Sequence, residues 1–447
     1  LHPRVRRQRQ MCIRDSSYTG SRSIIHRVIQ IDFSSISAFL TGFSTYPQPL
    51  RLRLRIFTIF FLYKQTHQAV RKGELSTIMK LVFDKADLVK SVGIAMKAVS
   101  GKTTMPILEC ILIDASSNVI KFTSNDMELG IETIVTGMIL ERGIVALDAK
   151  IFSEIVRKLP DNQVTIETDE NLVTTITCEK AKFNIPGQSG EDFSYLPILE
   201  TSDCVSISQF TLKELIRQTI FSIAANENNK LMTGELFEIK DNTLRVVSLD
   251  GHRIAIRRIE LKDSYPDRKV VVPGKTLNEI SKILSGEMDD QIDIYFSENH
   301  IMFKFDDTTV VSRLIDGEYF RIDQMLSSDY ETKVTINKKE FLSCIDRATL
   351  LVKEGDKKPI IIDIQDGAME LQINSAMGSM KEEIDINKEG KDIMIGFNPK
   401  FLIDALRVID DEEISIYLVN PKAPCFIRNE EESYIYLILP VNFNSVR

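Results

Sequence analysis

Apolar residues from Met79 onward follow two periods, whose alternation predicts a repeated α+β unit. A strand-like run at 80–83 precedes a stretch at 87–99 with apolar side chains at helical spacing. Strand-like runs follow at 107–113, 119–123, 129–135 and 143–146, then a helix led by Lys150, then strands at 164–168, 172–178 and 181–185. Turn signals such as Asp161-Asn162 separate these runs. The pattern predicts two antiparallel sheets with two helices.

The same order of elements returns twice. A strand at 205–207 and a helix at 211–224 open a second copy, and a strand at 333–336 and a helix at 338–352 open a third. Leu88, Leu215 and Phe341 align in the three leading helices at steps of 127 and 126 residues. Such an internal period predicts three copies of one unit, joined near 201–203 and 327–330.

A second helix in each copy begins with lysine and carries another basic residue seven positions later. These pairs, at a period of 125 residues for the lysines, are Lys150 with Arg157, Lys275 with Lys282, and Lys400 with Arg407. Residues seven apart share one helix face, so each copy offers a basic stripe beside an apolar one. Such charges usually just solvate an outer face. If the three units face a common centre, they instead form a cationic lining, and duplex DNA is its natural occupant because phosphates repeat regularly.

Charge is distributed unevenly along the chain. The formal net charge is −8 over 447 residues, a length that fits three ordinary domains. Residues 1–78 hold 13 Lys and Arg against 3 Asp and Glu, which leaves 43 basic and 61 acidic residues from Met79 onward. So acidic a body argues against coating nucleic acid with the whole surface, but it allows cations gathered on one face.

Residues 1–78 do not resemble the remainder. They are rich in Arg and Ser, poor in acidic residues, and include an alternating Arg-Leu run at 51–55. A transit peptide has a similar composition. We favour translated upstream or vector-like sequence, with Met79 as the native start, and we expect this non-homologous extension to be poorly ordered.

The six cysteines show no C-x-x-C spacing and no zinc-site or disulfide pattern, so we expect reduced, mostly buried thiols of a cytosolic protein. The longest strongly apolar run, 56–63, is far shorter than the ~20 residues of a membrane-spanning helix. We therefore expect no transmembrane segment.

A search for catalytic motifs favours a protein without enzyme chemistry. From Met79 onward the histidines are His252 and His300, and neither lies in an H-E-x-x-H motif. The string at 101–104 is similar to the end of a phosphate-binding loop, but Met96 stands where that loop needs glycine. We interpret Asp126 and Asp250 as repeated turn residues rather than a carboxylate pair. We expect no catalytic residue, metal or cofactor.

Five strings along 79–447 carry a resemblance to a known family. They are Met79-Lys-Leu-Val-Phe83, Met105-Pro-Ile-Leu108, Leu249-Asp-Gly-His-Arg-Ile-Ala255, Ile315-Asp-Gly-Glu318 and Tyr436-Leu-Ile-Leu-Pro-Val441. They resemble the bacterial DNA polymerase III beta subunit, the replication sliding clamp. The resemblance implies the α+β DNA clamp fold, with clamp domains at 79–201, 202–329 and 330–447 that together form half of a ring.

The same resemblance implies function and partners. We expect a non-catalytic cytoplasmic protein that closes as a head-to-tail homodimer around double-stranded DNA. It would tether the replicative polymerase for processivity and dock the clamp loader and other proteins that carry a clamp-binding motif. The family's loop contacts to DNA match Lys102, where arginine is more familiar, and Asn226, and they add to the six cations above.

The resemblance also implies two protein interfaces. An apolar pocket between the second and third domains, which takes short peptides, falls on Met232, Leu249, Gly251, His252, Arg253, Ile254, Leu437, Leu439, Pro440 and Val441, and Phe320 stands in its wall where the family often has proline. Ring closure falls on Phe183, Leu350 and Leu351. From the residues alone, the apolar C-terminal run is more simply the last strand of a sheet, and Leu350 and Leu351 are more simply core residues.

Three alternatives remain open. One is a nucleic-acid-modifying enzyme that has acquired clamp-like repeats, and another is a structural repeat protein without a DNA function. A eukaryotic-type clamp is disfavoured, because that resemblance would call for two units per chain rather than three.

Overall fold

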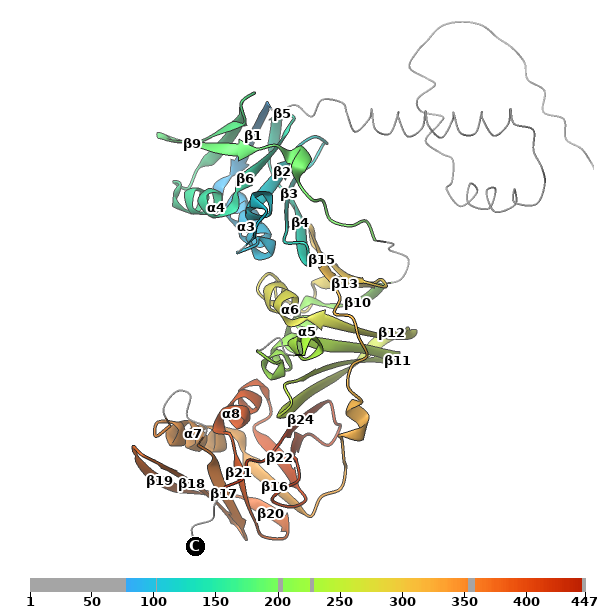
Figure 1. Cartoon of the computed structure of the whole chain (residues 1–447), viewed down its shortest axis with the longest axis vertical. Helices are drawn as coiled ribbons and strands as arrows, with labels where there is room; N and C mark the ends of the chain where they lie inside the picture. The colour runs from blue at the N-terminus through green and yellow to red at the C-terminus, as the bar shows by residue number, and fades with distance from the viewer. Residues whose placement is uncertain (1–77, 102, 200–203, 226–228, 353–357, 444–447) are drawn as a thin grey trace, which may run out of the picture. The chain divides into compact units, whose positions relative to one another are not determined.

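The computed structural model describes residues 78–101, 103–199, 204–225, 229–352 and 358–443 (Figure 1). Residues 1–77, the predicted join at 201–203, and the candidate DNA contacts Lys102 and Asn226 lie outside these ranges. The described residues form three units of one construction, as the sequence period predicts, each with two α-helices and antiparallel strands.

The first unit packs helices α3 and α4 against each other and buries alternate residues of its first strand, Met79, Leu81 and Phe83. Period-two burial of this kind is what a half-buried strand requires. Its elements are β1 (Met79–Asp84), α3 (Lys85–Ala95), β2 (Cys110–Asp114), β3 (Ile120–Asn125), β4 (Leu129–Val135), β5 (Met138–Glu141), β6 (Ile144–Asp148), α4 (Ala149–Lys158), β7 (Gln163–Thr168), β8 (Val173–Cys178) and β9 (Ala181–Gln188).

The second unit contains two long strands, with α5 and α6 side by side next to them (Figure 1). Register shifts around Asp241, at φ +54°, divide β11, so that 234–239 pairs with 268–273 of β12 and 243–249 pairs with 254–260. The elements are β10 (Cys204–Ser208), α5 (Gln209–Arg217), β11 (Gly234–Leu249), β12 (Arg253–Pro273), α6 (Gly274–Ser281), β13 (Gln291–Phe296), β14 (His300–Phe305) and β15 (Thr308–Arg313).

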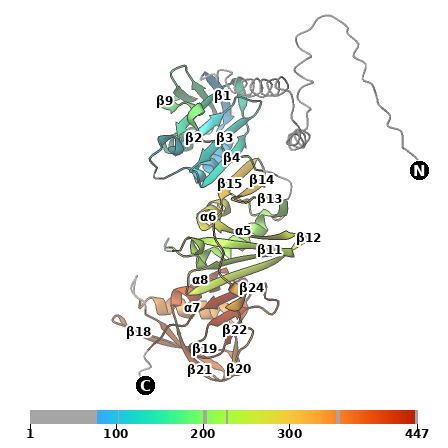
Figure 2. The same cartoon turned by 45° about the vertical axis from the view of Figure 1, so that its right-hand side comes forward.

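The third unit repeats the pattern, with α7 beside α8 (Figures 1 and 2). Its core is the largest apolar cluster of the described residues and includes Phe341, Leu402 and Leu406 from the two helices. The elements are β16 (Thr332–Asn337), α7 (Lys338–Thr349), β17 (Ile360–Gln365), β18 (Ala368–Ser375), β19 (Gly378–Asp385), β20 (Asn387–Gly390), β21 (Ile393–Phe397), α8 (Pro399–Val408), β22 (Glu413–Leu418), β23 (Cys425–Arg428) and β24 (Tyr434–Ile438).

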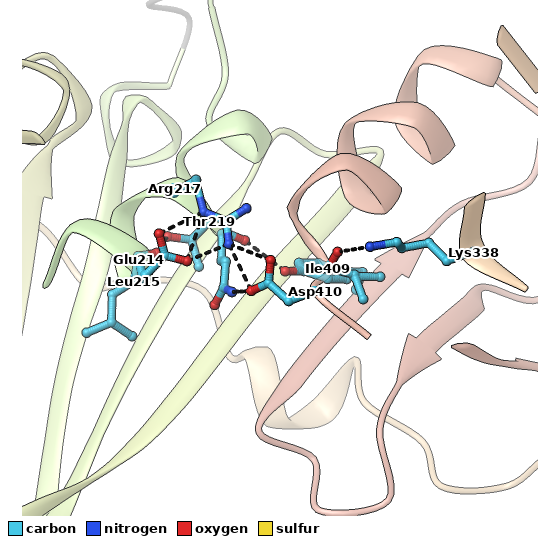
Figure 3. A network of polar contacts seen from close by, with 9 residues as sticks. Glu214, Leu215, Arg217, Thr219, Lys338, Ile409 and Asp410 are labelled. Carbon is cyan, nitrogen blue, oxygen red and sulfur yellow. Dashed lines mark hydrogen bonds and ion pairs between the residues drawn. The ribbon is translucent and has the colours of Figure 1, made fainter. Parts of the chain in front are cut away.

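Neighbouring units join through strand pairs, so that sheets run across the unit boundaries. β4 of the first unit pairs antiparallel with β15 of the second, and β12 of the second pairs with β24 of the third. At the second joint, Arg217 of α5 also bonds to Asp410, just beyond α8. Within the third unit, Lys338 Nζ donates to the carbonyl oxygen of the preceding residue, Ile409, at 2.6 Å (Figure 3). The units are therefore linked by both backbone and side-chain contacts.

Several element bounds differ from the sequence prediction, and local chemistry explains them. The helix predicted at 211–224 ends at Arg217, because Thr219 has φ −126°, and a 3-10 turn follows at Ile220–Ser222. The strand predicted at 107–113 begins only at Cys110, because Pro106 opens a 3-10 turn. The helices predicted at 87–99 and 338–352 end earlier, at Ala95 and Thr349, and β5 and β20 were not predicted.

The cysteines of the described residues are unpaired, as predicted, and four of the five are buried. Burial raises the pKa of the Cys425 thiol to about 12, which keeps that thiol protonated and unreactive. No helix in the described ranges is long and apolar enough to cross a membrane.

Candidate functional site

The three lysine-led helices form where the sequence predicts them, and local caps explain two of their starts. The Asp148 side chain accepts from the backbone N–H of Ile151 at 2.8 Å, and the Asn398 side chain accepts from that of Lys400 at 3.1 Å. Such caps satisfy backbone donors that a helix leaves free in its first turn. Pro273 precedes α6 and offers no side-chain cap.

The predicted cations on these helices are exposed, but they differ in their partners. Lys150 and Lys400 have no carboxylate within 4.0 Å among the described residues. Three others pair with a carboxylate of their own unit, namely Arg157 with Glu154 at 4.0 Å, Lys282 with Glu279 at 2.7 Å and Arg407 with Asp346 at 3.3 Å. Exposed pairs of this kind contribute little and exchange readily with another anion.

Lys275 is different, because its Nζ lies 2.5 Å from Oδ2 of Asp126 in the first unit. The Asp126 side chain is only 7% exposed. This lysine therefore bonds across a unit boundary, a role that the repeat pattern did not predict.

Asp126 and Asp250 occupy the same turn in two units, as predicted. Oδ1 of Asp126 accepts from the N–H groups of Glu128 and Leu129, and Oδ1 of Asp250 accepts from those of His252 and Arg253. These bonds make each aspartate a turn residue. In the described ranges, no group of three or more His, Cys, Asp or Glu could hold a metal ion.

Five of the predicted pocket residues meet in one apolar cluster between the second and third units. Leu249, Ile254 and Leu437 are buried there, and Met232 and Phe320 pack against them. Phe320 contacts Tyr319 edge to face at 5.6 Å, and both rings line an adjoining cleft of about 500 Å³. The aromatic residue that stands in the proline's place therefore packs on the apolar cluster and lines this cleft.

The remaining pocket residues lie around the 250–253 turn and the C-terminal segment. Gly251 adopts φ +85°, which favours glycine, and the His252 ring stacks on Phe401 at 6.0 Å. The backbone N–H of Leu439 donates to the His252 carbonyl, and that of Val441 donates to the Gly396 carbonyl, with Pro440 between them. Arg253 is buried and bonded within the protein. The turn and the C-terminal segment thus lie side by side, joined by the Leu439–His252 backbone bond and by the pairing of Arg253 with Ile438.

The residues assigned to ring closure are at the surface. Phe183 is 40% exposed and Leu350 is 75% exposed, whereas Leu351 is half-buried. The simpler interpretation of Leu350 as a core residue is wrong. Sequence reasoning missed one signal, the equivalence of strands along the period. At the 125-residue period β19 corresponds to β4 and β9 corresponds to β15, and β4 and β15 are the strands that pair at the first joint.

Comparison with known proteins assigns the family. The family models for the three domains of the DNA polymerase III beta subunit each match part of the chain. The N-terminal domain matches residues 79–197, the central domain 206–320 and the C-terminal domain 323–442. A beta sliding clamp of Staphylococcus epidermidis is 33% identical over 375 residues, which cover 81% of this chain and 99% of that protein.

Solved structures agree with this assignment. A putative DNA polymerase III beta subunit from Eubacterium rectale is 71% identical, with a TM-score of 0.80 over 82% of this chain and 100% of that one. The DNA polymerase sliding clamp of Bacillus subtilis is 35% identical, with a TM-score of 0.79 over the same shares. The chain belongs to the bacterial DNA polymerase III beta subunit family, the non-catalytic beta sliding clamps.

Proposed function

We propose that this protein is a cytoplasmic DNA sliding clamp. Two copies close head to tail around duplex DNA, and the ring tethers the replicative polymerase and docks the clamp loader and other proteins with a clamp-binding motif. Clamp domains would span 79–201, 202–329 and 330–447. The main support for this proposal is the way in which successive units join.

Equivalent strands make both joints within the chain. At the first joint Leu129 of β4 pairs with Ser312 of β15, and at the second Arg253 of β12 pairs with Ile438 of β24. The partners move by 124 and 126 residues, which is one repeat. Each unit therefore gives the same strand to the next unit.

This rule leaves two strands, β19 and β9, without a partner strand from another unit among the described residues. β19 is the third copy of β4, and among the described residues it pairs only with β18. β9 is the first copy of β15, and residues 181–186 of β9 pair only with β8. Applied once more, the rule joins β19 of one chain to β9 of another, near a register of Met380 with Phe183. Such a head-to-tail contact closes into a ring when the rotation allows it.

Charge and apolar surface at these edges favour the same pairing. Lys180 and Lys182 lie at β9, whereas β19 carries Glu382, Glu383 and Asp385 against one lysine, Lys381, which pairs with Glu370 of its own chain. Leu351 lies close to Gly378 at the start of β19. Opposite charges select a partner edge, and exposed apolar residues such as Phe183 and Leu350 supply buried area.

A ring also explains how an acidic protein holds DNA. Only the lining must meet phosphates, and Lys150, Lys400 and the weakly paired cations offer that contact without reading sequence. Lys102 and Asn226 belong to the proposed DNA contacts by family resemblance. Attraction through exposed charges weakens with salt, while a closed ring holds DNA without it.

The test is topological. The full chain, and a chain starting at Met79, are loaded by a clamp loader onto nicked circular DNA and followed by gel filtration before and after linearisation. We expect retention on the circle that is lost on cutting. Equal retention on both forms would indicate ordinary surface binding, and no retention on the circle would contradict the ring; a Leu350→Asp variant serves as the open-ring control.

A further inference from the structure

Arg253 differs from the other residues assigned to the partner pocket, because it is a buried cation that is bonded within the protein. Its side chain is 8% exposed, and each of its three nitrogens donates to an acceptor of the protein. Nε bonds to Asp250 at 3.0 Å, Nη1 bonds to Asp404 of α8 at 2.7 Å, and Nη2 bonds to the Phe221 carbonyl at 2.6 Å. Three of the five N–H donors of the guanidinium are thus bonded to acceptors of the second and third units.

Two aromatic rings enclose the same guanidinium. Its carbon lies 4.5 Å from the Phe401 ring centroid in the third unit and 5.3 Å from the Phe221 centroid in the second. Cation–π contacts strengthen when the cation is shielded from water. We call Arg253, Asp250, Asp404, Phe221 and Phe401 the joint latch.

The first joint has other contacts at the positions that correspond to the joint latch. Leu129 stands at the position of Arg253 there, buried in an apolar cluster, and the turn aspartate Asp126 receives its cation from Lys275 across the joint. In the second joint the turn aspartate is paired with Arg253 from its own turn, and the same arginine reaches across to α8. One residue therefore performs both tasks at the joint that carries the pocket.

The latch lies where the 249–254 turn meets the C-terminal segment. Arg253 pairs in the sheet with Ile438, which stands between Leu437 and Leu439, and the neighbouring His252 carbonyl holds the Leu439 N–H. We infer that Arg253 is a positioning residue, which fixes the 249–254 turn against the C-terminal segment, and that it does not contact the partner peptide. This inference rests on the proposed pocket.

The experiment is a double-mutant cycle in the full chain with Arg253→Met and Asp404→Asn, because Asp404 lies on α8 outside the assigned pocket residues. The probe is a labelled peptide that spans the clamp-binding motif of the host's replicative polymerase, measured by fluorescence anisotropy. We expect each variant to weaken binding about tenfold, and the double variant to be no weaker than Arg253→Met within twofold. Glu279→Gln, one repeat before Asp404, is the matched control and should leave the affinity unchanged.

Two results would overturn the inference. If Asp404→Asn binds like the wild type while Arg253→Met is weakened, the arginine contacts the peptide. Fully multiplicative losses would likewise mean separate roles. A wild-type chain that fails to bind the peptide refutes the pocket instead, and the latch is then judged without peptide, by electron–electron distances between spin labels on Lys262→Cys and Lys422→Cys with Cys12 and Cys204 changed to Ser. A distance distribution that broadens in Asp404→Asn but not in Glu279→Gln supports the latch, and an unchanged one refutes it.

Discussion

Lys275 and Asp126 come from different units, yet Nζ of the lysine lies 2.5 Å from Oδ2 of the aspartate. The lysine is 62% exposed, while the aspartate is almost fully covered and uses its other oxygen in a turn. A cation counted among three equivalent DNA contacts thus also serves a structural pair. The repeat places three lysines at equivalent positions, but among the described residues Lys275 pairs with a carboxylate of a neighbouring unit, whereas Lys150 and Lys400 pair with none.

Lys275→Met is therefore expected to differ from Lys150→Met and Lys400→Met. It leaves a covered carboxylate without its cation, which should cost about 1–2 kcal/mol of unfolding free energy. The other two variants should stay within about 0.5 kcal/mol of the wild type. Urea unfolding measures this difference, and equal effects of all three substitutions would contradict a special role for the Asp126 pair.

Glu235 gives a prediction for pH dependence. It is fully buried, its carboxyl lies against Thr219, and that hydroxyl donates its proton to the Leu215 carbonyl at 2.6 Å, so neither carboxyl oxygen has a hydrogen-bond partner among the described residues (Figure 3 shows Thr219 and Leu215). Burial raises the pKa of Glu235 well above 4.5 in the folded protein. The folded state then holds a proton that the unfolded state has lost, so stability falls as pH rises above about 4.5 and up to the folded pKa.

Glu235→Gln should remove this part of the pH dependence. Near neutral pH we expect the variant to be more stable by about 1–3 kcal/mol, and the difference should shrink toward pH 4.5. Urea midpoints measured from pH 4.5 to 8 check the sign. A gain that is the same at every pH would mean that packing, rather than ionisation, is responsible.

The sequence predicted the elements of this fold well because period and composition agree over three copies. It predicted their ends less well, since these depend on single residues such as Pro106 and Thr219. The apolar residues of the sequence, together with the family resemblance, were enough to predict the apolar cluster between the second and third units. The bonds of Arg253 and Lys275, in contrast, depend on which carboxylate a neighbouring unit brings close. The period shows which strands are equivalent, but it does not show these side-chain bonds, because a joint brings together residues that are far apart along the chain.

Ring closure makes a prediction about assembly. Leu350→Asp should convert dimers to monomers of about 51 kDa without loss of fold, because the side chain is 75% exposed within one chain and an aspartate there stays hydrated. Sedimentation velocity measures the mass, and circular dichroism checks the fold. Met138→Asp changes a 62% exposed residue of β5, an edge strand that β8, β7 and β1 separate from β9. It is the matched control and should leave dimers intact. Monomeric wild type at micromolar concentration would contradict the proposed interface.

Charge reversal tests the orientation of the same interface. Glu382→Lys with Glu383→Lys should weaken the dimer, since β9 carries Lys180 and Lys182 at the proposed partner edge. Adding Lys180→Glu and Lys182→Glu should restore it, because the opposite charges are then exchanged. Sedimentation of all three proteins, repeated at high salt, decides the question. Failure of the second pair of substitutions to rescue would exclude β9 as the partner of β19.

Phe320 tests whether the departure from the family's proline changes the pocket. Its ring packs on Tyr319 and against the cluster that contains Leu249 and Leu437. Phe320→Pro removes this ring, which should lower the unfolding free energy by about 1–3 kcal/mol and weaken partner peptides about three- to tenfold. Phe320→Leu retains most of the apolar volume, so peptide affinity there should lie between the two. If Phe320→Pro loses stability but binds peptide like the wild type, the ring supports the fold beneath the pocket and takes no part in its wall.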